Sequence, residues 1–143
     1  MLLGQWQFWA VLSALFAALT AILAKVGVEN IGSDLATFIR TIVIVLMAGL
    51  IVWGTGQWQG AGSISPRSWI FLVLSGIATG LSWLCYFRAL KLGDVSRVAP
   101  IDKLSVVFVA VIAFLFLRER LSGINWLGVL LIAAGAILVS VRA

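Results

Sequence analysis

The side chains best suited to chemistry in this sequence are hydroxyls spaced along one apolar stretch. They recur every three or four residues, with an indole beside them: Ser75, Thr79, Ser82, Trp83 and Tyr86. In a helix this spacing puts the four hydroxyls on one face, the hydroxyl stripe, and Ser13 and Thr20 in an earlier stretch offer a second polar edge that could face it. Ser and Thr hydroxyls also bond to the carbonyl four residues earlier or to a neighbouring helix. We expect the stripe to line a substrate cavity, with hydrogen bonding between helices as the alternative.

Three charged residues lie inside stretches that are otherwise apolar: Arg40, Asp102 and Lys103. A charge near the centre of a membrane helix costs at least about 2.5 to 3.5 kcal/mol, so such residues usually face a cavity or one another. Asp102 and Lys103 follow Pro100, and we expect them about one turn into a helix. We expect all three to edge an aqueous vestibule and to select the charge of what enters it. The alternative is that Arg40 and Lys103 reach the membrane surface while Asp102 caps a helix or forms an ion pair.

Several kinds of catalytic site are missing from the sequence. It has no His and one Cys, Cys85, so it lacks an internal disulfide, a multi-thiolate metal site and the usual general base. It also has no nucleotide-binding loop and no nucleophile triad. We therefore expect no enzyme activity, no metal and no cofactor. Its acids, Asp34, Asp94 and Asp102 among them, avoid the middle of the first apolar stretch, which disfavours proton-coupled export of cations.

The elements that carry these residues are predicted to be membrane-spanning helices. Of the 143 residues 63% are hydrophobic and 10% are charged, and the mean hydropathy is +1.18, whereas a soluble domain carries about 25% charged residues. A span needs roughly 20 apolar residues, and five stretches approach or reach that length: 6–25, 34–53, 68–90, 98–117 and 124–141. Backbone groups in lipid must bond internally, so the sequence predicts an all-α integral membrane protein with five transmembrane helices in one domain, residues 1–143. The net charge of +5 then reflects orientation in the membrane, and we expect no nucleic-acid partner.

Small residues mark faces of these helices where another helix can approach closely. The third stretch carries Gly76 and Gly80, and the last carries Gly128 and Gly135. We expect these faces to pack within the chain. Contact with another subunit through the last stretch is the alternative.

The distribution of Trp and of basic residues predicts the orientation. Six of the seven Trp lie on the side of the N-terminus: Trp6, Trp9, Trp53, Trp58, Trp69 and Trp126. That side has three basic residues, Arg67, Arg118 and Arg120, against seven on the other: Lys25, Arg40, Arg88, Lys91, Arg97, Lys103 and Arg142. The positive-inside rule therefore places the N-terminus outside and the C-terminus in the cytoplasm. If Arg40, Arg88 and Lys103 serve a site inside the membrane, the bias is weak and insertion in both orientations stays open.

Several motifs in the chain resemble a known family. The most specific are YFRALKLGDVSRVAPIDKLS at 86–105, FLRERLS at 116–122 and the Gly-rich GVLLIAAGAILV at 128–139, while FIRTIV at 38–43 agrees more loosely. Taken together, they resemble EamA-domain proteins of the drug/metabolite transporter superfamily across essentially the whole chain.

The resemblance implies an architecture. Larger members have ten helices, arranged as two five-helix repeats of inverted topology around a central cavity, and substrate sites lie at such repeat interfaces. This chain resembles one such repeat, half of a transporter, so we expect a homodimer, most simply antiparallel, or a complex with a partner half. The family glutamate matches Glu119, which we interpret as an interfacial structural residue.

The resemblance also implies a function in the cell membrane (inner or plasma membrane) of a prokaryote. The leading hypothesis is a secondary transporter or exporter of small metabolites or amphiphilic compounds that works by alternating access. The alternatives are a non-transporting subunit that stabilises a larger membrane partner and a flippase for lipid-linked intermediates.

Overall fold

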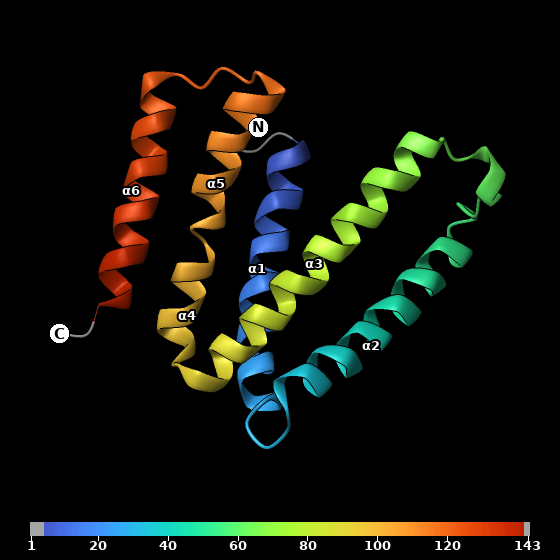
Figure 1. Cartoon of the computed structure of the whole chain (residues 1–143), viewed down its shortest axis with the longest axis horizontal. Coiled ribbons are helices and arrows are strands. Elements are labelled where there is room, and N and C mark those ends of the chain that lie inside the picture. Colours follow the sequence, from blue (N-terminus) through green and yellow to red (C-terminus); the bar gives the residue numbers. More distant parts are fainter. Residues whose placement is uncertain (1–4, 142–143) are drawn as a thin grey trace. The chain divides into compact units, whose positions relative to one another are not determined.

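Every regular element of the described chain is a helix. The computed structural model describes residues 5–141, apart from the side chains of Gln5 and Ala61. In chain order the elements are α1 (Gln5–Gly27), α2 (Ser33–Gly54), the 3₁₀ turn η1 (Ala61–Ser63), α3 (Pro66–Leu92), α4 (Val95–Asp102), α5 (Ser105–Ile112), the π-helical turn η2 (Ala113–Leu117) and α6 (Gly123–Ser140) (Figure 1). Five stretches are long and apolar enough to cross a membrane: Trp6–Gly27, Ser33–Gly54, Pro66–Leu92, Val95–Leu117 and Gly123–Ser140. The prediction of an all-α membrane protein with five spans is confirmed.

The spans begin and end within three residues of the predicted limits, and side-chain caps explain where two of them begin. Helix α3 begins at Pro66 because the Ser65 hydroxyl accepts a hydrogen bond from the Ser68 N–H at 3.1 Å, and proline needs no N–H at the first position. Helix α6 begins at Gly123, where the Ser122 hydroxyl accepts from the Asn125 N–H at 3.3 Å. Arg142, one of the basic residues counted for orientation, lies outside the described residues.

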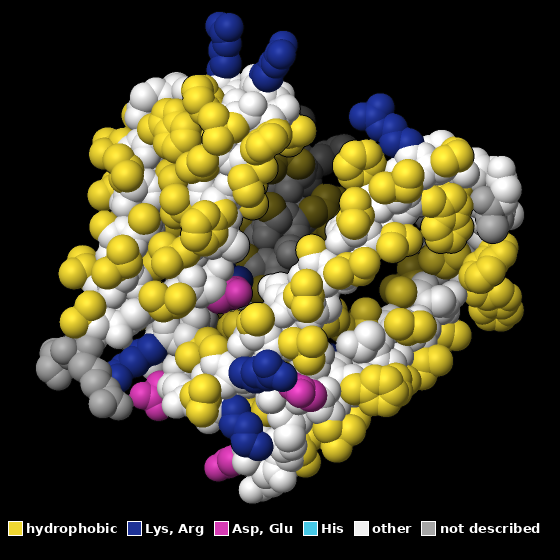
Figure 2. Space-filling view, in the orientation of Figure 1, with side chains coloured by type: hydrophobic (Ala, Val, Ile, Leu, Met, Phe, Trp, Pro, Cys, Tyr) yellow, Lys and Arg dark blue, Asp and Glu magenta, His cyan; other side chains and the backbone are white. Residues whose placement is uncertain are grey.

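Apolar side chains cover the long faces of the helices. Leu15, Leu46 and Leu72 are each more than half exposed, and Figure 2 shows hydrophobic side chains along the visible helices, with most charged side chains near helix ends. A soluble protein rarely exposes apolar surface on this scale. The exposed surface therefore matches helices that face lipid.

The chain forms two compact units, one made of residues 24–91 and the other of residues 5–23 with 92–141. In the unit 24–91, two lysines tie helix ends together. The Lys25 ammonium donates to the Leu90 carbonyl at 2.7 Å, and the Lys91 ammonium donates to the Ile31 carbonyl. Val28 and Leu90 are almost fully buried beside these contacts. These two hydrogen bonds bring the start of α2 next to the end of α3, so they help to fix which residues of the two helices face each other.

In the other unit, α4 and α5 pack against α6. At one end the Ser140 hydroxyl donates to the Arg97 carbonyl at 3.2 Å. At the other end the rings of Phe114 and Trp126 meet edge to face, with centroids 5.9 Å apart. Helix α6 is therefore antiparallel to the fourth span along its whole length.

The fourth span is not the continuous helix predicted over 98–117. Helix α4 ends at Asp102 and α5 begins at Ser105, and the connection uses bonds three residues apart: the Leu104 N–H donates to Ile101 and the Val106 N–H to Lys103, both at 3.0 Å. Pro100 lies inside α4, where it has no N–H for the bond to the Ser96 carbonyl and its ring crowds that carbonyl, so α4 is weakened on the N-terminal side of the interruption. The span then ends in η2 with Arg118 in the left-handed region, at φ 55°.

Candidate functional site

Arg40 lies over the aromatic rings of α3. Its guanidinium carbon is 4.2 Å from the centroid of Trp83 and 5.6 Å from that of Phe87. The structure thus brings together two of the predicted site residues, Arg40 and Trp83, from neighbouring spans. Phe87, which is buried, was not predicted; its position four residues after Trp83 was the signal, because that spacing stacks two rings on one helix face.

The hydroxyl stripe lies on α3, as its spacing predicts. Ser75, Thr79 and Ser82 are exposed and Tyr86 is half-buried. The Thr79 hydroxyl donates a hydrogen bond to the Ser75 carbonyl at 2.8 Å. This is the local bond to the carbonyl four residues earlier, which is an alternative use of such a hydroxyl. A hydroxyl that donates to a carbonyl still has oxygen lone pairs that accept, so the cavity role of the stripe stays a prediction.

Asp102 and Lys103 lie next to the interruption of the fourth span. The Lys103 ammonium and the Asp102 carboxylate are 3.1 Å apart, with the two side chains 55% and 35% exposed. Since the span begins at Val95, both residues lie about two turns into it, not one turn as predicted. At 1.5 Å per residue that is about 10 to 12 Å from the start of the span, in a hydrocarbon core about 30 Å thick. An opposite-charge pair therefore lies near the depth at which the helix is interrupted.

The remaining predicted site residues belong to different parts of the structure. Ser13, which is exposed, and Thr20, which is half-buried, lie on α1 in the unit that contains Asp102. The hydroxyl stripe and Arg40 lie in the unit 24–91. That Ser13 and Thr20 face the stripe, and that Arg40 shares a vestibule with Asp102 and Lys103, stay predictions.

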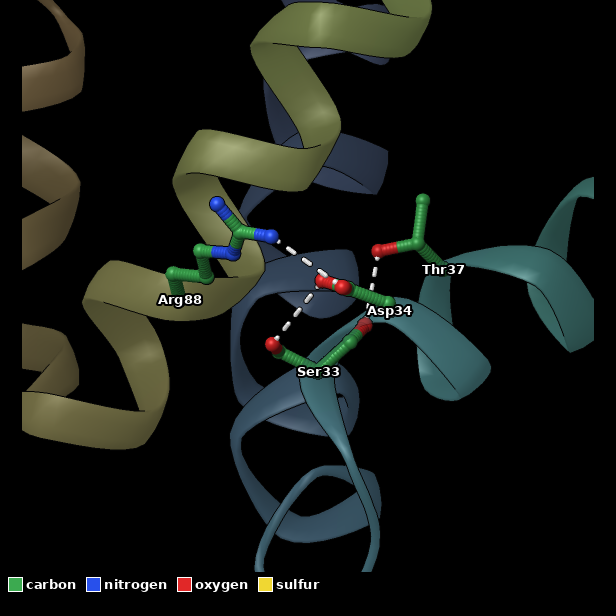
Figure 3. Close-up of polar contacts among 4 residues, drawn as sticks. All are labelled: Ser33, Asp34, Thr37 and Arg88. Carbon is green, nitrogen blue, oxygen red and sulfur yellow. Dashed lines mark hydrogen bonds and ion pairs between the residues drawn. The ribbon is translucent and has the colours of Figure 1, made fainter.

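An ion pair missed by the sequence analysis joins the second and third spans. The Arg88 guanidinium lies 3.1 Å from the Asp34 carboxylate, which also accepts a hydrogen bond from the Ser33 hydroxyl at 3.2 Å (Figure 3). The Thr37 hydroxyl donates to the Ser33 carbonyl at 2.9 Å in the same cluster. This pair balances the Arg88 charge and links the start of α2 to the end of α3. Arg40, six residues after Asp34, forms no ion pair with a carboxylate of the described residues and lies on aromatic rings instead.

The glycines expected to pack within the chain have no close neighbour there. A Cβ built on Gly76, Gly80, Gly128 or Gly135 would meet no heavy atom of the described chain within 4 Å, apart from immediate neighbours and the helix's own backbone. Intrachain packing at these four positions is therefore not observed. Within the described residues there is also no group of three or more Cys, Asp or Glu placed to hold a metal ion.

With five membrane-spanning helices, the chain is a multi-pass membrane protein. It matches the EamA-like transporter family over residues 4–141 and belongs to that family. The family resemblance seen in the sequence motifs is confirmed.

Three relatives show the range of proteins to which the chain is similar. An uncharacterized transporter in the cobO 3′ region of Sinorhizobium sp. is 64% identical over 137 residues, which cover 96% of this chain and 97% of the relative. The uncharacterized transporter YxxF of Bacillus subtilis is 31% identical over 143 residues, 99% of this chain but 44% of that protein. A probable 4-amino-4-deoxy-L-arabinose-phosphoundecaprenol flippase subunit, ArnE, of Pseudomonas fluorescens is 30% identical over 88 residues, 59% of this chain and 75% of that one. No solved structure matches the chain.

Proposed function

We propose that this protein is a secondary transporter of small metabolites that carry both signs of charge, amino-acid-like or amphiphilic, and that it works by alternating access between two five-helix subunits. The observation that carries the proposal is the interruption of the fourth span beside Asp102 and Lys103. The backbone at the interruption keeps its hydrogen bonds through turns of the 3₁₀ type, so it is the charged pair beside it that calls for water or a polar partner at that depth. Interrupted helices with charged side chains line the substrate sites of many secondary transporters.

The Asp102–Lys103 pair suits a substrate with charges of both signs. A zwitterion can exchange partners with the pair, its cationic group going to the carboxylate and its anionic group to the ammonium, so no charge is left unpaired inside the membrane. In the unit 24–91, Arg40 lies over Trp83 and Phe87 and offers a cation next to an aromatic surface. That combination suits a substrate with an acidic group and an apolar part.

The lengths of the relatives support an assembly of two copies. The Sinorhizobium relative, like this chain, has the length of one repeat, whereas YxxF has room for two. The open glycine faces of α3 and α6 offer surfaces on which a second copy can pack. All three relatives are bacterial, and we place the protein in the inner membrane of a bacterium.

The test is transport by purified protein in liposomes, screened against amino acids, other zwitterions and amphiphiles. We expect flux of one class, with strong loss in Asp102→Asn and Lys103→Met. Asp94→Asn is the matched control: Asp94 lies at the start of the same span, pairs with Arg97 at 4.0 Å, and Asn caps a helix as well as Asp does. Wild-type flux in Asp102→Asn, or equal loss in Asp94→Asn, would exclude the proposed site.

The likeness to ArnE favours one alternative, a flippase subunit for lipid-linked intermediates. Such a subunit would move a labelled polyprenyl-phosphate sugar across the bilayer, alone or with a partner, and would give no uptake of soluble substrates. Scrambling of that lipid in the same liposomes separates the two functions. A constant membrane partner in a cross-linked preparation, with neither activity alone, would indicate a non-transporting subunit.

A further inference from the structure

The loop between α2 and α3 forms a recess that the proposed transport function does not use. It has a volume of about 580 Å³ and is lined by Val52, Gln57, Trp58, Gln59, Ile64 and Trp69. This volume lies in the range of small-molecule sites, about 300 to 1,000 Å³. The loop joins the end of the second span to the start of the third, so the recess lies at the membrane surface.

The α2 side of the recess is shaped by a Schellman motif. Gly56 has φ 65°, its N–H donates to the Trp53 carbonyl at 3.2 Å, and the Gln57 N–H donates to the Val52 carbonyl at 3.1 Å. This pair of bonds reverses the chain after a helix, and glycine adopts the positive φ without a Cβ penalty. The motif places Gln57 back over Val52, and both line the recess.

The α3 side is shaped by the cap at Ser65. The Ser65 hydroxyl accepts from the Ser68 N–H, Pro66 takes the first helical position, and Ile64 and Trp69 occupy the two positions that pack together in a hydrophobic staple. Both staple residues line the recess. The two helix ends therefore set the positions of Val52, Gln57, Ile64 and Trp69, while Trp58 and Gln59 come from the connection between them.

The chemistry of the lining selects the class of ligand. Two indole rings provide flat apolar surfaces, and two glutamine carboxamides each provide donors and an acceptor. None of the described residues that line the recess is charged, and the neighbouring Arg67 lies over the ring of Phe71, 5.9 Å from its centroid. A phosphate or carboxylate would find no counter-charge, whereas a ring with apolar C–H faces and several hydroxyls matches both kinds of wall.

We propose that this recess binds a neutral sugar ring, as the headgroup of a glycolipid or as a free sugar, at the membrane surface. The binding is measured without flux, so it stands or falls separately from the proposed transport.

The test uses full-length protein in phosphatidylcholine nanodiscs, purified without sugar-headed detergents, which would occupy the site. One arm adds a monoglucosyl diacylglycerol to the nanodiscs in rising proportion, a second adds methyl glucoside in solution, and a third replaces the glycolipid by phosphatidylglycerol. Hydrogen–deuterium exchange of residues 52–69 and tryptophan fluorescence report binding. We expect protection with the glycolipid and none with phosphatidylglycerol. Protection by methyl glucoside would show that the free sugar suffices, and protection by the glycolipid alone would assign the source to the membrane.

Variants in the lining provide the decisive comparison. Trp58→Ala is expected to lower apparent affinity at least tenfold, and Gln57→Ala and Gln59→Ala about 2- to 13-fold each for a lost hydrogen bond. These side chains are exposed, so the fold tolerates their truncation. Trp53→Ala is the matched control, an exposed indole at the same helix end that does not line the recess. No response to either sugar probe, an equal response to phosphatidylglycerol, or equal loss in Trp53→Ala and Trp58→Ala would overturn the proposal and leave the indoles as membrane anchors.

Discussion

Arg40 is the side chain whose environment most needs a functional explanation. It lies inside the second span, and its guanidinium is placed over Trp83 and Phe87. Asp34 takes Arg88 as its partner, so the nearest acid on the same helix is engaged elsewhere. A cation held by ring faces keeps its hydrogen-bond donors for a ligand, which a carboxylate partner would occupy.

We predict that Arg40→Lys lowers transport of the compound found in the liposome screen. Lysine keeps the charge but loses the planar stacking, a contact of about 0.5 to 2 kcal/mol, so flux should fall about 2- to 30-fold. Arg67→Lys is the control, because Arg67 lies over Phe71 at 5.9 Å near the start of α3, whereas Trp83 and Phe87 lie toward its other end. Unchanged flux in Arg40→Lys, or equal loss in both variants, would show that the stacking has no role in transport.

At the scale of single elements, hydropathy predicts the spans well because burial of about 20 apolar residues in lipid dominates their energy. Hydropathy gives no information on whether backbone hydrogen bonds join residues three or four positions apart. The interruption at Lys103 and Leu104 was therefore missed, although Pro100 and two charges were visible in the sequence. The pairing of Arg40 with Trp83 was missed for another reason. It depends on the register of α2 against α3, which the distant contacts of Lys25 with Leu90 and Lys91 with Ile31 help to set.

Alanine substitution is expected to have opposite effects on stability at the two prolines of the chain. Pro100→Ala restores an N–H inside the fourth span, so we expect stability to rise by up to about 3 kcal/mol while flux falls several-fold. Pro66→Ala acts at the first turn of α3, where proline is favourable, so we expect a loss of about 0.4 to 1 kcal/mol with flux retained. Thermal unfolding in nanodiscs and amide exchange at 103–105 measure both effects. Full flux in a Pro100→Ala protein with slowed exchange there would show that transport does not need the interruption.

Alanine substitution at Gly56 and at Gly54 distinguishes the effect of backbone strain from the effect of steric clash. A Cβ meets no heavy atom within 4 Å at either position, but only Gly56 has a positive φ. We predict that Gly56→Ala costs about 1 to 2 kcal/mol of stability, whereas Gly54→Ala at the end of α2 is neutral or stabilises by up to about 1 kcal/mol. Thermal unfolding compares the two, and equal effects would mean that the Schellman turn does not determine the stability of this loop.

At the scale of the whole molecule, orientation in the membrane is the first property to measure. In a Cys85→Ser background, a new cysteine at Gly60 tests the loop after the second span. An impermeant thiol reagent on intact cells should label it almost fully if the N-terminus is outside and the C-terminus is in the cytoplasm. The weak charge bias also permits two orientations, and labelling of about half the protein would indicate them.

The last prediction concerns how two copies combine. Gly60→Lys with Gly62→Lys adds two cations to the loop between α2 and α3 and should keep that side of the protein in the cytoplasm, because basic residues resist translocation. Glu29→Lys with Asn30→Lys should keep the opposite side in the cytoplasm for the same reason. If the working unit is an antiparallel pair, its cavity needs one copy in each orientation, as in the inverted repeats of longer transporters. Each locked variant alone should then give no flux, and co-expression of the two should restore it. Immunoblots must show equal expression of all samples for the comparison to be valid. Full flux from either variant alone would establish a parallel assembly or a single functional subunit.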